Sequence, residues 1–219
     1  MFDMKTTLAA GLALTLVAGT AQAAPIDITS QITNPSFEDG AGGDGAGGST
    51  FNPSGWSATS GAFRPRAFAP GVGGNIFPND GSAQAWMNNG TSGWQLTGET
   101  IVSGTQYTLT VDLNADQANF PNIEDTIIRL YGDTLGTGTA FAEINPQSVA
   151  SSNAWVTHSV SFTAGATENN QTLGVLLGVT SGTQVEWDNL TLTKEVIPEP
   201  SSLALLGLGG LLVARRRRG

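Results

Sequence analysis

The segment Tyr107-Thr108-Leu109-Thr110-Val111-Asp112-Leu113 alternates large apolar residues with polar ones at every position. A period of two is typical of a β-strand that buries one face and exposes the other. The same alternation recurs from Val156 to Phe162, and again from Thr172 to Val179, where Leu176 adds an apolar residue on the second face. We therefore expect half-buried strands in the first two segments and a strand covered on both faces in the third.

Shorter apolar runs predict further strands at residues 83–87, 126–131 and 141–144, joined by connections rich in Gly, Ser, Thr and Asn. No segment between residues 24 and 197 shows a sustained 3.6-residue stripe of an amphipathic helix. Many short strands with turn signals between them favour a single all-β sandwich or jelly roll. The stretch from 24 to 197 is long enough for one domain with a substantial core.

The segment from Val185 to Leu192 breaks the alternation once. Its apolar residues occupy odd positions as far as Trp187 and even positions from Leu190 onward. One extra residue must be absorbed at Asp188-Asn189, as in a β-bulge, which can turn an acidic side chain and free carbonyls toward one point. Near the other end of the domain, Glu38 is a second acid directly before a loop, the glycine-rich residues 40–48.

The N-terminus carries an export signal. An apolar stretch from Leu8 to Ala18 is followed by Ala21-Gln22-Ala23, a small-x-small cleavage pattern. Together they predict a secretory signal peptide over residues 1–23.

The C-terminus, residues 198–219, combines three parts: Pro198-Glu199-Pro200, an apolar run from Leu203 to Ala214, and four arginines, Arg215, Arg216, Arg217 and Arg218. An apolar segment closed by a basic cluster is typical of a membrane anchor with its charges in the cytoplasm. The run would form a helix of only about 18 Å, against a bilayer core of about 30 Å. We expect a short hydrophobic helix that resides in the membrane weakly or transiently; a buried core helix is the alternative, which the arginines disfavour.

Composition excludes several classes of function. Of the 18 acidic residues, 16 lie between residues 24 and 197, against four basic ones, so this stretch carries a net charge of −12. Such acidity argues against binding to nucleic acid or to anionic membranes and suits calcium. The chain has no cysteine and one histidine, which leaves no set of ligands for zinc and no cysteine nucleophile.

The C-terminal segment resembles the PEP-CTERM sorting signal, in its Pro198-Glu199-Pro200 triplet, its short Leu/Gly/Ala-rich run and its terminal arginines. This resemblance implies recognition by an exosortase, cleavage near the triplet, and a role connected with exopolysaccharide. We therefore expect an exported protein of the cell envelope, outer surface or extracellular matrix, anchored at first in the inner membrane.

The region between the two signals resembles the carbohydrate-binding-module and galactose-binding-like jelly rolls. The likeness lies in the opening Asn34-Pro35-Ser36-Phe37-Glu38 with Trp56 after it, the entry Gly104 to Leu109, and the closing Trp187-Asp188-Asn189-Leu190. It implies one structural Ca²⁺ bound by Glu38 and Asp188, with backbone carbonyls completing a shell of oxygen ligands. The alternative is that Glu38 faces solvent and Asp188 accepts hydrogen bonds from the amides of the bulge.

The tryptophans bear on ligand binding. Trp86, Trp155 and Trp187 lie in strand-like patterns and are expected in the core. Trp56 and Trp94 each follow a glycine, and an exposed ring there would stack on a sugar, while Arg64 and Arg66 supply polar contacts. For Trp56 the alternative is a core plug beneath the preceding loop.

Three hypotheses on function follow. The first is a non-catalytic module that associates with exopolysaccharide or another glycan. The second is a structural envelope protein without a ligand. The third is a polysaccharide hydrolase or lyase, which requires two paired acids. The chain has acids close in sequence, Glu124-Asp125 and Glu186 with Asp188, but no pair that the sequence singles out. We expect no enzymatic activity.

Overall fold

The computed structural model describes residues 23–39, 52–59, 63–67, 78–114, 125–133, 138–146, 154–182 and 184–197, without the side chains of 63–67. Residues 23–197 form one compact unit. The predicted signal peptide, the glycine-rich loop at 40–48 and the sorting segment lie outside the described residues, except for Ala23. Within the described part, no helix is long and apolar enough to cross a bilayer.

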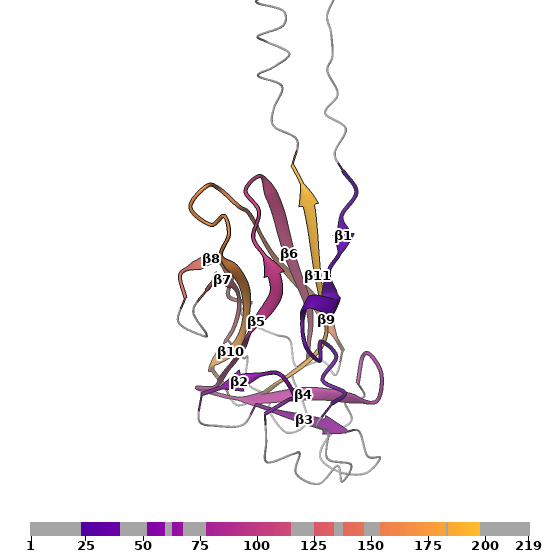
Figure 1. Cartoon of the computed structure of the whole chain (residues 1–219). Coiled ribbons are helices and arrows are strands. Elements are labelled where there is room, and N and C mark those ends of the chain that lie inside the picture. Colours follow the sequence, from indigo (N-terminus) through magenta and orange to yellow (C-terminus); the bar gives the residue numbers. More distant parts are fainter. Residues whose placement is uncertain are drawn as a thin grey trace, which may run out of the picture. The chain divides into compact units, whose positions relative to one another are not determined.

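The domain is a sandwich of two antiparallel sheets, which confirms the predicted all-β jelly roll (Figure 1). Sheet A has the order β3 (Phe63–Ala67), β4 (Ala83–Asn88), β11 (Gln184–Val196), β6 (Thr105–Asn114) and β9 (Val156–Thr163), and β1 (Ile26–Asp27) pairs with β11 as well. Sheet B has the order β2 (Ser57–Ala58), β5 (Ser92–Thr100), β10 (Thr172–Ser181), β7 (Asp125–Gly132) and β8 (Ala140–Ile144).

The alternating segments form the centre of both sheets. In β6, the side chains of Tyr107, Leu109, Val111 and Leu113 are fully buried in the core. In β10, Leu173, Val175 and Leu177 enter the same core, and Leu176, on the opposite face, is only 4% exposed. The prediction of a strand covered on both faces is therefore confirmed. The other predicted strands correspond to β4, β7, β8, β9 and β11.

The predicted bulge lies in β11. The register of β11 with β6 shifts between Asp188 and Thr191, and Asn189 has a left-handed φ of +51°. Asn tolerates this conformation better than most residues. The extra residue returns Leu190 and Leu192 to the core face, as the change of parity in the sequence predicted.

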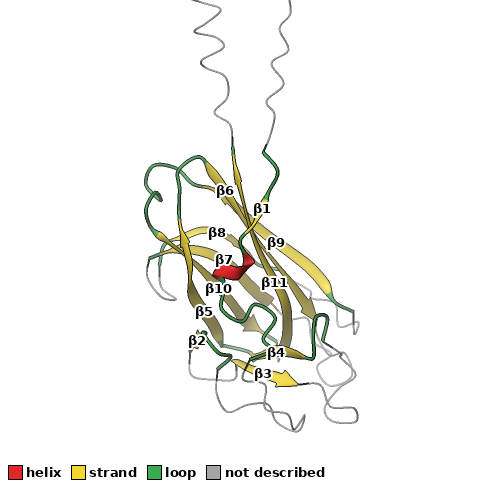
Figure 2. Cartoon of the chain, turned by 45° about the vertical axis from the view of Figure 1, so that its right-hand side comes forward, coloured by secondary structure: helices red, strands yellow, loops and turns green. Residues whose placement is uncertain are grey.

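Beyond the bulge, the N-terminal segment takes the place of β4 beside β11. The Leu190 amide donates to the Pro35 carbonyl (3.1 Å), and the Ile28 amide donates to the Leu192 carbonyl (2.8 Å). The 3-10 helix η1 (Thr29–Gln31) contacts both β11 and β5 (Figure 2). The N-terminal segment thus closes one open side of the sandwich, and Ile28 and Ile32 are buried in the core.

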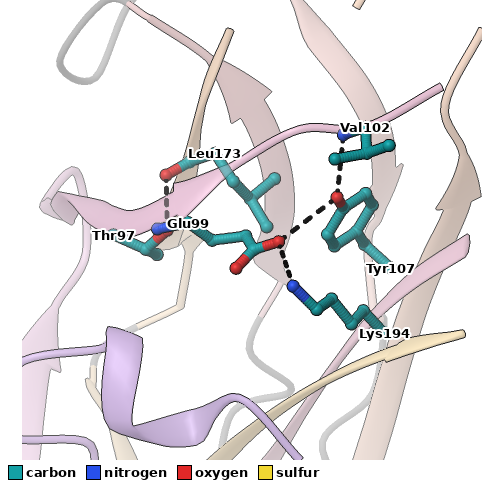
Figure 3. Close-up of polar contacts among 6 residues, drawn as sticks. All are labelled: Thr97, Glu99, Val102, Tyr107, Leu173 and Lys194. Carbon is teal, nitrogen blue, oxygen red and sulfur yellow. Dashed lines mark hydrogen bonds and ion pairs between the residues drawn. The ribbon is translucent and has the colours of Figure 1, made fainter. Parts of the chain in front are cut away.

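Strand β5 was not predicted, because its buried positions are polar. Gln95, Thr97 and Glu99 are at most 8% exposed. The Gln95 amide group pairs with both backbone groups of Thr33, and the Thr97 hydroxyl donates to the Leu173 carbonyl. Glu99 forms an ion pair with Lys194, with 2.7 Å between Oε1 and Nζ (Figure 3). These partners satisfy polar groups where the alternation rule expects apolar ones.

Candidate binding site on the outer face of sheet A

The pleat of β11 directs alternate side chains to the two faces of sheet A. Val185 and Trp187 lie in the core, so Glu186, between them, is on the outer face. Its register partners are Trp86 in β4 and Asn114 in β6. Paired residues share a face, and Trp86, Glu186 and Asn114 therefore form a row across three strands. We call this set the outer row.

A second row lies beside the first, towards the bulge. Asp188 is the register partner of Asp112, and Asp112 is the partner of Thr157 in β9. Asp112 accepts hydrogen bonds from the Thr157 hydroxyl (2.5 Å), the Asn79 amide group (2.5 Å) and the Asn189 amide group (2.9 Å). The two acids are buried side by side, and in the described part of the chain neither Asp112 nor Asp188 has an ion-pair partner.

The side chains around the outer row are polar and buried. Glu186 is 3% exposed, Asn114 is fully buried, and Gln84 and Gln184 are at most 8% exposed. Gln184 Nε2 donates to Glu186 Oε1 at 2.7 Å. By contrast, neither polar atom of the Asn114 amide group has a hydrogen-bond partner within the described structure, and Gln84 Oε1 has none either. Buried polar groups are normally hydrogen-bonded, so these atoms indicate a place where a ligand or water binds.

The two predicted metal ligands, Glu38 and Asp188, hold the same short segment before β4. Glu38 Oε1 accepts from the amides of Ser82 (2.9 Å) and Ala83 (2.8 Å). Asp188 Oδ2 accepts from the amides of Asn79 (2.7 Å) and Asp80 (2.8 Å). The two acids therefore approach one segment from two ends of the sequence, and each has a role that requires no metal.

The carboxyl of Asp188, at the bulge, has a raised pKa. Its side chain is fully buried, and burial raises the pKa of this carboxyl from 3.8 to about 6. Hydrogen bonds from the backbone amides of Asp80, Asn189 and Asn79 favour the charged form and offset part of this effect. The described residues contain no group of three or more Asp, Glu or His side chains arranged to hold a metal ion. The calcium site at Glu38 and Asp188 stays a prediction.

Two of the predicted sugar-binding residues, Trp56 and Trp94, lie on different faces of the sandwich. Trp56 is 5% exposed and packs on Phe37, with 5.5 Å between ring centroids, so the alternative of a core plug holds for this residue. Trp94 is partly buried on the outer face of sheet B. Arg64 and Arg66 belong to β3 as the register partners of Trp86 and Gln84, and their side chains lie outside the described ones.

The tryptophans expected in the core also differ from one another. Trp187 is fully buried in the core. Trp86 instead lies in the outer row and is partly buried, as is Trp155 just before β9. Sequence reasoning missed the outer row, although parity could have placed Glu186 and Trp86 opposite the core face of their strands.

Comparison with protein families gives two matches. Residues 28–193 match the family described as HpiC1-like, HpiC1 cyclase. The chain belongs to the HpiC1-like family. Residues 196–218 match the PEP-CTERM protein-sorting motif, which confirms the predicted sorting signal and marks an exported protein of the cell surface. No curated protein matches the chain.

Two solved cyclase structures share the fold, and a xylan-binding domain shows a weaker likeness. A Stig cyclase, Fisc from Fischerella sp. TAU, in complex with (3Z)-3-(1-methyl-2-pyrrolidinylidene)-3H-indole, is 20% identical with a TM-score of 0.62, covering 80% of this chain and 100% of that one. A cyclase from the same organism has a TM-score of 0.63 at 20% identity, covering 80% and 99%. The CBM22-1 xylan-binding domain of Paenibacillus barcinonensis Xyn10C is 13% identical, with a TM-score of 0.48 and coverage of 74% and 92%.

Proposed function

We propose that this exported protein binds a glycan of the cell surface or matrix through the outer row of sheet A. The observation that carries the proposal is the fully buried Asn114 amide group, which lacks a hydrogen-bond partner within the described structure. Glu186 lies beside Asn114 in the row, and Trp86 lies on the other side of Glu186. Carbohydrate sites combine an aromatic ring for the apolar face of the sugar with polar groups for its hydroxyls. The outer row supplies both.

The burial of the outer row has a kinetic consequence. Since Glu186 and Asn114 are almost inaccessible to solvent, a ligand reaches them only after the covering groups move. A required conformational change lowers the association rate below the usual range of about 10⁵–10⁷ M⁻¹s⁻¹. Trp86 is the more exposed member of the row, and we infer that the sugar contacts its ring first.

The sorting motif supports the cellular context of this proposal. The motif begins at residue 196, the last residue of β11, and Glu186 is ten residues earlier in the same strand. We infer that an exosortase processes the segment after β11 and that the apolar run holds the chain transiently in the inner membrane. The mature domain then associates with exopolysaccharide and has no catalytic role.

A structural Ca²⁺ at Glu38 and Asp188 is part of the same proposal. Its support is the donor set: two carboxylates from the two ends of the domain approach residues 79–83, and Asp188 is buried with no cationic partner in the described structure. Carboxylate and carbonyl oxygens are the ligands that Ca²⁺ prefers. A bound ion would join β11 to the N-terminal segment.

A second candidate function is a cyclase. Family membership and the buried Glu186 carboxyl favour it, because ring closure by acid–base catalysis needs a side chain that transfers a proton inside a desolvated site. In this case Trp86 would hold an aromatic substrate, and Glu186 would be the residue that donates a proton to it and later takes one back.

Binding and turnover of the full chain separate the two candidates. We expect neutral polysaccharides to bind, with weaker binding in Trp86→Ala and Glu186→Gln and normal binding in Trp94→Ala. Binding of (3Z)-3-(1-methyl-2-pyrrolidinylidene)-3H-indole that depends on Glu186, without binding of any glycan, would favour the cyclase instead. Binding of neither would leave the structural envelope protein as the function and contradict both.

A further inference from the structure

A groove of about 440 Å³ opens on the side of the sandwich where β8 and β9 are the outermost strands of their sheets. Ligand pockets commonly have volumes of about 300–1,000 Å³. The groove is lined by Phe141 from β8, Phe162 and Thr163 from β9, and Glu168 and Gln171 from the turn before β10. None of these residues belongs to the outer row or to its neighbours.

Two aromatic rings form the apolar floor of the groove. The ring centroids of Phe141 and Phe162 are 4.9 Å apart, and the rings are tilted by 32°. Both side chains are partly buried and pack against the core. Phe141 belongs to sheet B and Phe162 to sheet A, so the pair closes the sandwich at this side. Part of each ring remains accessible from the groove.

The floor is supported from behind by Tyr107. Its ring stacks on Phe162, with 5.5 Å between centroids and 23° between planes. The Tyr107 hydroxyl accepts from the Val102 amide at 3.0 Å and lies 3.4 Å from Glu99, which is paired with Lys194 (Figure 3). These contacts fix Phe162 before a ligand arrives, and preorganisation lowers the cost of binding.

The position beside the floor requires glycine. A Cβ atom at Gly132 would lie 2.1 Å from Gln171 Oε1 and 2.4 Å from the ring of Phe141. Contacts this short do not occur, so Phe141 and Gln171 take their places only because residue 132 has no side chain. The aromatic floor and the amide at its rim are therefore packed as one unit.

The described residues at the rim of the groove are polar, and none of them is basic. Glu168 accepts hydrogen bonds from the Gly165 amide (2.7 Å) and from the Thr167 hydroxyl. These bonds, that of Thr167 first, lower the pKa of Glu168, and the carboxylate retains lone pairs for a ligand hydroxyl. Thr139 and Thr163 add hydroxyls to the same rim.

We propose that this groove is a second, independent binding site for a neutral sugar unit. The apolar face of the sugar lies on Phe141 and Phe162, and its hydroxyls donate to Glu168 and bond with Thr163. An anionic sugar is disfavoured because, among the described lining residues, the charged group is the Glu168 carboxylate. The inference shares a ligand class with the proposed function but does not rest on the outer row.

The test uses cellobiose and xylobiose as probes of the full chain, with glucuronic acid as the anionic comparison. We expect Glu168→Gln, a change of an exposed turn residue, to lower the affinity for the better disaccharide about tenfold, the loss of a hydrogen bond to a charged group. Thr163→Trp, which fills the groove from an exposed position, should abolish saturation-transfer NMR signals from the ring protons. Circular dichroism establishes that both variants fold.

The matched variant Trp86→Ala separates this inference from the proposed function. Groove binding retained in Trp86→Ala and lost in Thr163→Trp supports the second site. The groove proposal is overturned if neither disaccharide binds, if both groove variants bind like the wild type, or if glucuronic acid binds as tightly as the neutral probes. If Trp86→Ala alone abolishes binding, the outer row is the glycan site and the groove is not.

Discussion

The outer faces of the two sheets satisfy their polar groups in different ways. On sheet B, Arg129 Nε donates to Glu143 Oε2 at 2.6 Å, and the Tyr131 hydroxyl donates to the Gln95 carbonyl at 3.1 Å. On sheet A, Asp112 and Asp188 lie side by side without an ion pair in the described structure, and the Asn114 amide group has no partner there. Both faces carry a tryptophan, Trp94 on B and Trp86 on A.

The two outer faces therefore differ in how far their own strands supply partners for their polar groups. The two contacts named on sheet B's face join strands of the same sheet, β7 with β8 and β7 with β5, although Trp94 Nε1 is a buried donor without a described partner. Sheet A instead keeps a polar amide and two buried acids at a cost in folding free energy. Stability that is lost at one place in a fold commonly marks a functional site.

The largest expected effect is on the stability of sheet A. Asp188→Ala removes the acceptor of three backbone amides, those of Asn79, Asp80 and Asn189. We expect a loss of about 3 kcal/mol in the free energy of unfolding, since each buried donor left unsatisfied costs about 1 kcal/mol or more. Urea denaturation measures it. The control Asp27→Ala removes an exposed acceptor of one amide, that of Thr29; an equal loss in both variants would contradict the role given to Asp188.

The next largest effect is expected on the packing of β10 against β7 in sheet B. Gly174→Ala places a Cβ atom 2.3 Å from the ring of Tyr131, and overpacking of this kind costs about 2 kcal/mol. Gly178→Ala, in the same strand, meets only the Ser92 hydroxyl at 2.9 Å and should cost less. Thermal unfolding of the two variants tests the order. Glycan binding should remain in both, because sheet B's face is not the site.

The pH dependence of stability follows from Asp188. A folded-state pKa raised to about 6 means that the native state binds a proton at Asp188 more readily than the unfolded state does. Protonation of Asp188 therefore stabilises the fold at low pH, and this stabilisation is lost as the pH rises through 6. In a chelator we expect wild type to gain about 1 kcal/mol relative to Asp188→Asn between pH 7 and pH 5. Calcium bound by Asp188 would hold it ionised and remove this gain. If calcium changes neither stability nor its pH dependence, the predicted metal site is absent.

The smallest effect is expected at the ion pair of sheet B. Arg129→Met should reduce the free energy of unfolding by less than about 1 kcal/mol, as for other partly exposed pairs. Denaturation in low and high salt measures the contribution. A loss as large as that of Asp188→Ala would mean that the two faces do not differ as described.

Much of the fold could be predicted from alternation alone. The odd positions of β6 and the parity change at Asp188-Asn189 follow directly from which side chains enter the core. Strand β5 could not be predicted, because Glu99 and Gln95 are buried by partners far away in the sequence, Lys194 and Thr33. Short-range patterns do not contain such contacts.

The candidate site was harder to predict for the same reason. Glu186 and Trp86 are visible as strand residues, but their meeting with Asn114 depends on strand order and register. Trp56 follows a glycine and resembles an exposed ring, yet Phe37 covers it in the core. Local context therefore misplaced both Trp56 and Trp86, and only the assembled sheet identifies the face on which each ring lies.

The most direct test compares the two tryptophans on opposite faces. The affinity of the full chain for its best polysaccharide is measured for wild type, Trp86→Ala and Trp94→Ala by calorimetric titration. We expect a loss of about 2 kcal/mol, or roughly 30-fold, for Trp86→Ala, as for a central aromatic contact, and less than about a twofold change for Trp94→Ala. Loss of binding in Trp94→Ala with full binding in Trp86→Ala would contradict it.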